Sequence, residues 1–323
     1  MADSVTWVIG NANVDLTSYL AVLPEPGQTV MSDNFTIGMG GKGANQAVAA
    51  SRAGGNVAFV GRVGTDSFGD FVRNNLLLEH MDLSRLETVE GSSGVANIYV
   101  DRSGANQIAV YPGASAHLTP QVAKEALGTI ASTDYLVSQL EIDQETVLEA
   151  LRTAHEAGAT TVLNIAPYAP LLPGILDNTT WLIANELELR DLLNDRGLSN
   201  TLDLTHVNHI PEQIHEWVTS LGCNLVVTLG DKGAIGCVKG LEPLWFQPEP
   251  VDAIDTVGAG DCFVGFFVAY LQQGLPWQKA LAGGVIAASE SVQTAGAQDS
   301  FPESARAKAI FSEARGQTRK EKG

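Results

Sequence analysis

The fold of this 323-residue chain is decided by the stretch Asp255-Thr256-Val257-Gly258-Ala259-Gly260-Asp261. Residues 262–271 follow it and are apolar all round, which predicts a buried helix. Val251 and Ile254 precede it and are expected to end a strand. Gly258 and Gly260 therefore lie where a loop turns into a helix. They leave the backbone N–H groups of the first helical turn open to an anion such as phosphate.

Asp261 ends this stretch and would lie beside the bound anion. A carboxylate is an unfavourable neighbour for a phosphate, because like charges repel. It is useful there if it accepts a proton from a hydroxyl group that attacks the phosphate. The alternative is a helix cap, since Asp after a glycine turn commonly caps a helix. The stretch alone leaves both interpretations open.

A second glycine-rich turn reads Gly38-Met39-Gly40-Gly41-Lys42-Gly43-Ala44-Asn45-Gln46 and opens a helix. It matches GxGxxG, but the next predicted strand ends in Gly61-Arg62 rather than in the acidic residue of a dinucleotide site. It is not a P-loop either, because glycine follows Lys42 where Ser or Thr is required. The turn therefore predicts a polar ligand on backbone N–H groups, with Asn45 projecting from the first helical turn.

Asn13 and Asp15 follow a predicted buried strand over 5–9. Open α/β sheets bind ligands at the carboxyl ends of their strands. Two residues apart in extended chain, the amide and the carboxylate point the same way and suit the vicinal hydroxyls of a sugar. The alternative is an Asx turn that leaves the strand.

Strand and helix signals alternate from residue 120 onward, which predicts an α/β fold with a mostly parallel sheet and helices on both faces. We expect a single domain over 1–323. Two stretches, about 14–38 and 93–112, carry alternating strand signals instead and are expected to pair as a small β lid. Helices are expected over 120–130 and 211–221, and helices near 259–273 and 277–293 are expected to close the fold.

Composition excludes several function classes. The net charge of −18 argues against nucleic acid and against an anionic membrane surface. The three cysteines have no disulfide-framework or zinc spacing. No signal segment or membrane-spanning run is recognised, so a cytoplasmic location is expected. Carboxylates after strand ends, such as Glu141 and Glu188, are interpreted as Mg²⁺ contacts or as solvated loop residues.

The chain resembles the ribokinase-like carbohydrate kinase family, also called the phosphofructokinase B family, over nearly its whole length. One motif runs from Gly40-Gly41 through Asn45, Gly54 and Gly64, and the other is the 255–261 stretch. Within the family, the segments at 40–50, 111–115 and 296–300 are similar to those of ribokinases. The resemblance implies a three-layer fold, a sugar substrate, ATP, Mg²⁺, a monovalent cation such as K⁺, and a homodimer formed through the lid.

The resemblance also implies roles for particular residues. Asp261 would be the general base, and the backbone of Gly258, Ala259 and Gly260 would stabilise the transferred phosphoryl group. The positions that match the sugar-binding residues are Asn13, Asp15, Gly41, Lys42, Asn45 and Glu141. The positions that match the Mg²⁺–phosphate and nucleotide elements are Asn185, Glu188, Thr228 and Gly230. The positions that match the monovalent-cation loops are Asp255, Val257, Ser291, Thr294, Gly296 and Ser300.

The sequence departs from the family pattern at Phe266, where Ala or Gly is usual, and at Thr294 and Asp299, where Arg and Pro are often found. The leading hypothesis is an ATP-dependent kinase of D-ribose. The alternatives are a kinase of another sugar, a phosphosugar or a nucleoside, and a sugar-binding regulator without catalysis. The intact Asp261 and its glycines argue against the regulator.

Overall fold

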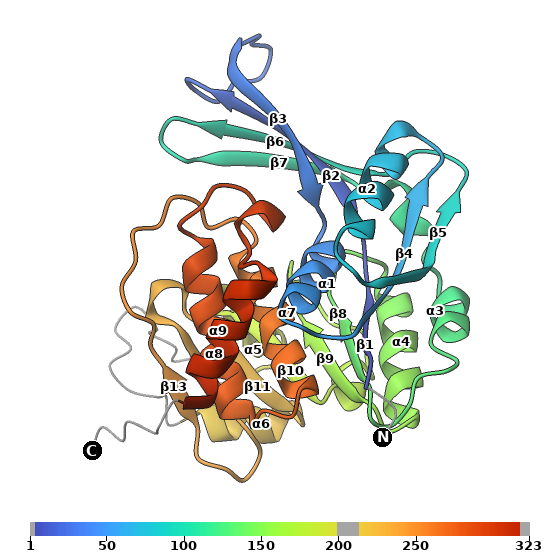
Figure 1. Cartoon of the computed structure of the whole chain (residues 1–323), viewed down its shortest axis with the longest axis vertical. Helices are drawn as coiled ribbons and strands as arrows, with labels where there is room; N and C mark the ends of the chain where they lie inside the picture. The colour runs from blue at the N-terminus through green and yellow to red at the C-terminus, as the bar shows by residue number, and fades with distance from the viewer. Residues whose placement is uncertain (1–3, 199–212, 317–323) are drawn as a thin grey trace.

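The computed structural model describes residues 4–198 and 213–316 (Figure 1). Two sheets contain the strands of this part of the chain. The strands are β1 Thr6–Ile9, β2 Asn13–Leu20, β3 Ser32–Gly40, β4 Val57–Gly64, β5 Asp82–Val89, β6 Gly94–Asp101, β7 Asn106–Tyr111, β8 Tyr135–Ser138, β9 Thr160–Asn164, β10 Trp181–Asn185, β11 Asn224–Thr228, β12 Ala234–Cys237 and β13 Leu244–Phe246.

The main sheet has nine strands in the order β13-β12-β11-β10-β9-β8-β1-β4-β5. The strands from β11 across to β5 in this order are mutually parallel. At the other edge, β12 pairs antiparallel with β11, and β13 pairs antiparallel with β12. β1 lies between β8 and β4, and Ile9 pairs with Ser138 and Val60. The carboxyl ends of the parallel strands therefore form one edge at which polar loops gather, as expected for this fold class.

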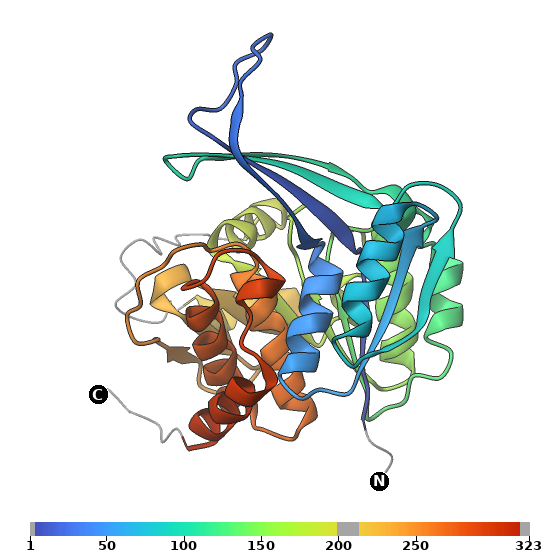
Figure 2. The same cartoon turned by 45° about the horizontal axis from the view of Figure 1, so that its top comes forward.

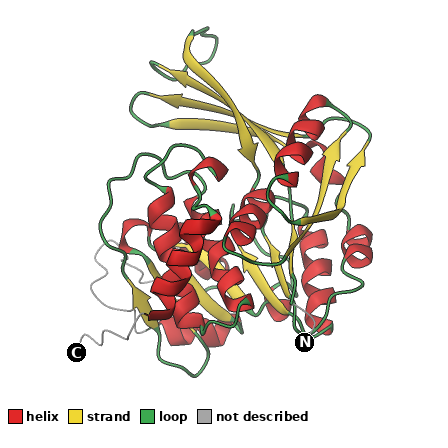
Figure 3. Cartoon of the chain, in the orientation of Figure 1, coloured by secondary structure: helices red, strands yellow, loops and turns green. Residues whose placement is uncertain are grey.

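Helices cover both faces of the main sheet (Figures 1 and 3). One face packs on α3, α4, α5 and α6, and the other on α1, α2, α7, α8 and α9. Alternate residues of the buried strands enter opposite cores, as Trp7 and Ile9 do on one face and Val8 on the other. The helices are α1 Lys42–Arg52, α2 Ser67–Leu77, α3 Pro120–Ala126, α4 Gln144–Glu156, α5 Glu186–Asp195, α6 Ile214–Leu221, α7 Ala259–Gln272, α8 Trp277–Ser291 and α9 Ser304–Gly316.

A separate four-stranded sheet, here called the lid sheet, has the order β3-β2-β6-β7. Figure 2 shows it extending above the body that the main sheet and its helices form. The two stretches expected at about 14–38 and 93–112 supply its strands. β2 and β6 pair in parallel, while β3 and β7 add antiparallel edges. Because β2 follows β1 directly, the lid sheet is joined to the carboxyl edge of the main sheet.

The buried helix predicted after the 255–261 stretch is confirmed as α7. Ten consecutive residues from Asp261 to Tyr270 are buried, because α7 packs between α1 and α8. Gly265 permits the close approach to α1, since a Cβ there would lie 2.5 Å from Ala49 Cβ. Phe266, the departure from the family pattern, is fully buried and meets Tyr270 edge to face at 5.7 Å.

Three expectations about the elements are wrong. No strand ends at Val251 and Ile254: β13 stops at Phe246, and a loop leads to the motif. This loop is held instead by the N–H groups of Ile254 and Asp255, which donate to Val292 O at 2.7 and 3.1 Å. The helix expected over 120–130 ends at Ala126, and α8 does not close the fold, because α9 follows it. Part of the helix expected over 211–221 lies outside the described residues.

Candidate active site

Helix α7 begins without a side-chain cap. Its N-cap residue, Gly258, has φ 77°, in the left-handed region that favours glycine. Within the described ranges, the N–H groups of Gly260 and Asp261 have no hydrogen-bond partner, whereas Ala259 N donates to Thr256 O at 3.3 Å. A Cβ added at Gly260 would meet no atom within 4 Å. Free donors and open space thus coincide at the positive end of a helix, which suits a phosphate.

Asp261 is 5% exposed, and two consecutive side chains of α1 hold its carboxylate. Asn45 Nδ2 donates to Oδ2 at 3.0 Å, and Gln46 Nε2 donates to Oδ1 at 2.9 Å. Neither oxygen accepts from the first turn of α7, so the interpretation of Asp261 as a helix cap is wrong. A carboxylate has about four acceptor positions, so Asp261 keeps capacity for the proton of a hydroxyl group.

The glycine-rich turn lies against the end of β1. Gly41 has φ 87°, and a Cβ there would lie 2.9 Å from Asn13 N. At Gly43 a Cβ would lie 2.6 Å from Asn11 O, and Ala44 N donates to this oxygen at 2.9 Å. Only glycine permits such an approach. It places the start of α1, with Lys42, Asn45 and Gln46, beside the N-terminus of α7.

Glu141 follows β8 and contacts the same turn. Its Oε2 accepts from Lys42 N and from Asn11 Nδ2, both at 2.9 Å. Asn11 Oδ1 also accepts from Gly43 N at 3.3 Å. Glu141 therefore fixes the glycine-rich turn and brings a second carboxylate to the edge that holds Asp261.

Asn13 and Asp15 lie in β2 and point to the same face of the lid sheet, because they are two residues apart. The Asp15 carboxylate packs against Gly40 and has no hydrogen-bond partner in the part of the chain that the structure describes. Burial raises the pKa of Asp15 to about 7, and the negative charges of Glu141 and Asp261 add to this shift. A largely buried carboxylate without donors fits a ligand that supplies them.

This raised pKa predicts a pH-dependent stability effect for Asp15→Asn. Folding favours the neutral form of Asp15, so the cost of its charge grows as the pH rises from the ordinary Asp pKa of 3.8 to about 7. At about 1.4 kcal/mol per pKa unit, the variant should gain up to about 4 kcal/mol of stability above pH 7 and little near pH 4. Its sugar affinity should fall.

Thermal unfolding of both proteins between pH 4 and pH 8 measures this effect. Asp177→Asn, at an exposed position, is the control and should show no such trend. A melting-temperature difference between Asp15→Asn and the wild type that does not change with pH would contradict the prediction.

Lys42 is the cation of this site. The negative charge of Asp261 raises the pKa of Lys42, and Glu141 and Glu188 contribute, although burial opposes the shift. Lys42 therefore stays protonated among carboxylates. A fixed positive charge next to Asp261 suits a ligand that brings phosphate charge to the same place.

The predicted nucleotide-side residues lie at the ends of β10 and β11. Asn185 and Glu188 form a capping box on α5: Glu188 N donates to Asn185 Oδ1 at 2.9 Å, and Asn185 N donates to Glu188 Oε2 at 2.8 Å. Burial raises the pKa of Glu188, although the cap and Lys42 oppose the shift. Thr228 pairs with Asn185 in the sheet register, and Gly230 follows it with φ 57°.

The described residues contain no group of three or more His, Cys, Asp or Glu side chains that could hold a metal ion. Such a cluster is not required for Mg²⁺ in a phosphoryl-transfer site, since the ion keeps several waters and binds one or two carboxylates plus substrate phosphates. Glu188, one of the carboxylates whose charge acts on Lys42, could supply one such carboxylate contact to the ion.

The residues expected around a monovalent cation lie on two loops, 254–258 and 291–300, which pack together. Asp255 joins them, because its Oδ2 accepts from Gly296 N at 2.9 Å and its Oδ1 accepts from Val257 N at 3.0 Å. Ser291 Oγ and Ser300 Oγ donate to the carbonyl oxygens of Ala288 and Ala297. Thr294 N donates to Ser291 O at 3.2 Å. The hydroxyls of Ser291 and Ser300 therefore already donate to backbone carbonyl groups.

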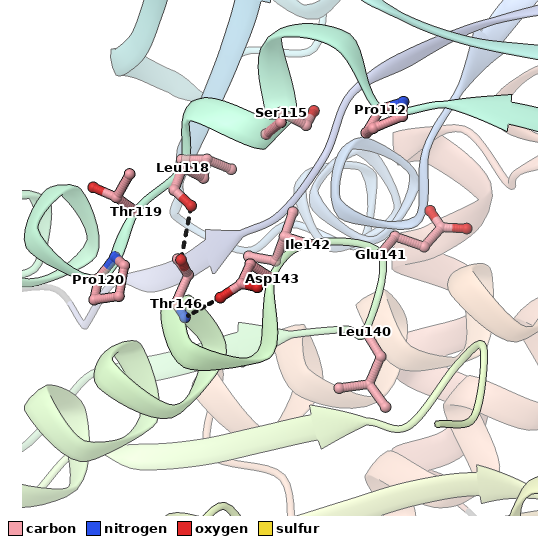
Figure 4. A pocket seen from close by; sticks show the side chains of 11 residues that line it. Pro112, Ser115, Leu118, Thr119, Pro120, Leu140, Glu141, Ile142, Asp143 and Thr146 are labelled. Atoms are coloured by element: carbon pink, nitrogen blue, oxygen red, sulfur yellow. Dashed lines mark hydrogen bonds between the residues drawn. The ribbon is translucent and has the colours of Figure 1, made fainter. Parts of the chain in front are cut away.

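A pocket of about 430 Å³ opens beside Glu141 (Figure 4). Ser115 lies on one side of it, and Asp143 and Thr146 of the α4 N-terminus lie on the other. Asp143 Oδ1 accepts from Thr146 N, and Thr146 Oγ1 donates to Leu118 O at 2.7 Å. Asp143 and Thr146 are thus satisfied within the wall, whereas Ser115 Oγ is buried and has no hydrogen-bond partner among the described residues. The pocket adjoins the site but does not include Asp261.

Sequence reasoning missed the amide side chains that surround Asp261. Gln46 Nε2 donates to Asn164 Oδ1 at 3.1 Å as well as to Asp261, and Gln139 Nε2 donates to Gln46 Oε1 at 2.7 Å. Gln298 Nε2 donates to Asn45 Oδ1 at 2.9 Å. All are buried. In the sequence, only Asn45 and Gln46 stand together, in the glycine-rich turn. The amides that they contact, Gln139, Asn164 and Gln298, are far away in sequence.

The lid sheet adds apolar neighbours that were also missed. Ala96 of β6 pairs with Asp15, and Val110 of β7 pairs with Ala96. Paired residues of adjacent strands share a face. The face that carries Asp15 therefore continues as an apolar surface across β6 and β7.

The profile of the pfkB family carbohydrate kinases matches residues 6–304. The chain belongs to this family. It is thus an ATP-dependent carbohydrate kinase, an enzyme that transfers a phosphoryl group to an alcohol, and its ribokinase-like fold is the one expected from the two motifs. None of the described helices is long and apolar enough to cross a membrane.

Relatives of this pfkB-family chain have closely related activities. Mouse ribokinase is 35% identical over 303 residues, which cover 91% of each chain. Salmonella typhi deoxyribokinase is 34% identical over 297 residues and covers 91% of this chain and 94% of its own. The structure of Arabidopsis thaliana ribokinase complexed with ribose and ATP superposes with a TM-score of 0.81 at 25% identity, over 96% of this chain and 99% of that one.

Proposed function

We propose that this chain is a ribokinase that transfers the γ-phosphoryl group of ATP to the primary hydroxyl of D-ribose, giving ribose 5-phosphate. The observation that carries the proposal is the buried Asp261 carboxylate beside the uncapped N-terminus of α7. Asp261 accepts the hydroxyl proton, and the free N–H groups of Gly260 and Asp261 stabilise charge on the phosphoryl group. Lys42 adds a positive charge there.

The neutral, hydroxyl-rich nature of the substrate follows from the carboxylates opposite the phosphate site. Asp15 lacks donors, and Asn13 Oδ1 is a buried acceptor with no partner among the described residues. Sugar hydroxyls would satisfy both, whereas a sugar phosphate would bring negative charge towards Asp15 and Glu141. The free, buried cysteines fit a reducing compartment such as the cytoplasm.

The experiment is an ADP-release assay with ribose, 2-deoxyribose, other pentoses, hexoses, fructose 6-phosphate and adenosine as acceptors. Ribose should give the highest kcat/KM. A higher value for 2-deoxyribose would favour the second candidate, a deoxyribokinase, which the Salmonella relative supports. Preference for fructose 6-phosphate or adenosine would overturn the assignment.

ATP would bind with its phosphates at the N-terminus of α7 and its nucleoside near Thr228 and Gly230, with Mg²⁺ near Glu188. A monovalent cation would occupy the paired 254–258 and 291–300 loops and shape the start of α7. We expect turnover to fall severalfold when K⁺ is replaced by Na⁺ or by a bulky organic cation. Steady-state rates in the three chloride salts measure this, and equal rates would exclude the cation site.

We further propose a homodimer through the outer face of the lid sheet, opposite Asp15. Phe35 and Tyr99 both pair with Ser18, so they share that face, and they are 52% and 40% exposed. Phe35→Asp should weaken the dimer, because it buries a charge in an apolar contact. Analytical ultracentrifugation measures this, with the exposed Leu241→Asp as the control. A monomeric wild type would contradict the proposal.

A further inference from the structure

Gln298 starts a chain of side-chain hydrogen bonds that ends at Asp261. It lies in the 291–300 loop, is 6% exposed, and donates from Nε2 to Asn45 Oδ1 at 2.9 Å. Asn45 Nδ2 then donates to Asp261 Oδ2 at 3.0 Å. A loop residue is therefore connected to the carboxylate through a single intervening amide.

The chemistry of these groups fixes which side chain donates and which accepts along this series of hydrogen bonds. An ionised carboxylate only accepts hydrogen bonds, so Asn45 must turn its NH₂ group towards Asp261. Asn45 Oδ1 then faces Gln298, which must donate. Without that donor, a buried carbonyl oxygen would be unsatisfied, and the Asn45 amide would lose the contact that holds it in this orientation. Turning it over would place an oxygen against the carboxylate of Asp261.

The backbone of Gln298 is fixed from behind. Arg52 Nη1 donates to Gln298 O at 2.7 Å and to Phe301 O at 3.3 Å. The guanidinium of Arg52 is itself held by the Glu79 carboxylate. Because these contacts use the Gln298 carbonyl group, substitutions of its side chain leave the anchor in place.

We propose that Gln298 is a positioning residue of the phosphoryl-transfer reaction: it sets the orientation of the Asn45 amide and thereby the placement of the Asp261 carboxylate. The 291–300 loop is coupled to the general base by this side chain as well as by the start of α7. This inference rests on the proposed kinase function. Turnover of ribose by the wild-type enzyme, measured in the same assay, separates failure of that function from failure of the inference.

Gln298→Met tests the proposal, because methionine keeps the size of the side chain but donates no hydrogen bond. We expect kcat to fall about tenfold, as for loss of one hydrogen bond, with the KM for ATP unchanged. The control is Gln293→Met in the same loop, whose exposed side chain donates only to Ser289 O at 3.4 Å. Thermal unfolding shows whether each variant is folded.

Gln298→Glu is the sharper variant, because it nearly preserves shape and inverts hydrogen bonding. The ionised Glu accepts and would turn the Asn45 amide over, whereas the neutral acid donates to Asn45 Oδ1 as Gln298 does. Of the charged groups in this network, Arg52 contacts the backbone carbonyl group of Gln298, and Asp261 lies one amide beyond its side chain. At pH 8 we expect kcat to fall about 10–100-fold, and the ratio of variant to wild-type kcat should rise as the pH is lowered to 6.

A purely structural role would not produce this pH-dependent recovery. The proposal is supported if Gln298→Met loses kcat selectively and the Gln298→Glu ratio rises at low pH. It is overturned if both variants stay within about twofold of the wild type at every pH. It is also overturned if the Gln298→Glu ratio is flat while kcat, the KM for ATP and the melting temperature deteriorate together.

Discussion

Asp261→Asn should lower kcat by about 10²–10⁴-fold, which is the usual worth of general-base assistance. The amide keeps the size of the carboxylate but cannot take the proton of the attacking hydroxyl. ATP binding should be nearly unchanged, because the N–H groups at the start of α7 remain. The measurements are single-turnover kinetics for the chemical step and calorimetric titration for ATP.

Asp261→Asn should also lower the stability of the fold, by a smaller effect, because of the side chains that donate to Asp261. Both oxygens accept from NH₂ groups, of Asn45 and of Gln46, so an amide at position 261 must set one NH₂ group against another. An unmet buried polar contact costs about 1–3 kcal/mol, which lowers the melting temperature but is well below the expected change in turnover.

The matched control is Asp143→Asn, because Asp143 is a true helix cap that accepts from the N–H groups of Glu145 and Thr146. Asn caps a helix about as well as Asp, so this variant should keep near wild-type turnover. Folded Asp261→Asn with comparable turnover would remove the general base from the proposed mechanism.

The sequence predicted the central features of the site because they depend on local pattern. The apolar run predicts α7, and the glycines predict a backbone opened to a ligand, as Gly258 and Gly41 show. The contacts that hold Asp261 were not predictable in this way. Asn45 and Gln298 are 253 residues apart, and Gln46 and Asp261 are 215 apart, so only the folded chain brings their amides together.

The helices and strands that the sequence did not predict were missed for different physical reasons. β13 has only three residues, and β5 lies at the edge of the sheet, where every residue except Leu86 is half-buried or exposed and no clear apolar alternation appears. α9 buries Ala307, Ile310 and Ala314, a helical spacing that small alanines make faint. The approach to the 255–261 stretch resembled a strand because of Val251 and Ile254, yet they are 40% and 71% exposed.

Gly260→Ala should abolish most turnover while leaving the fold intact. A Cβ at this position meets no protein atom within 4 Å, and Ala is favoured over Gly in a helix, so the melting temperature should stay or rise. If the open space is where the phosphoryl group lies, the methyl group displaces it. A misplacement of about 1 Å can cost about 10²-fold in rate.

Two other glycines show why position 260 is the informative one. Gly258→Ala would be strained, because φ is 77° and the Cβ would lie 3.0 Å from Ala297, so lost activity there could mean lost structure. Gly128→Ala is the neutral control, since its Cβ would come no closer than 3.4 Å to Glu125 O.

Nucleotide affinities then locate the effect of Gly260→Ala. ADP lacks the γ-phosphate, so it should bind as it does to the wild type, whereas ATP should bind more weakly because its γ-phosphate meets the new methyl group. Equal weakening of both nucleotides would place the α- or β-phosphate at Gly260 instead. Full turnover with normal ATP affinity would mean that the transferred group does not approach the start of α7, and the proposed site of phosphoryl transfer would have to be abandoned.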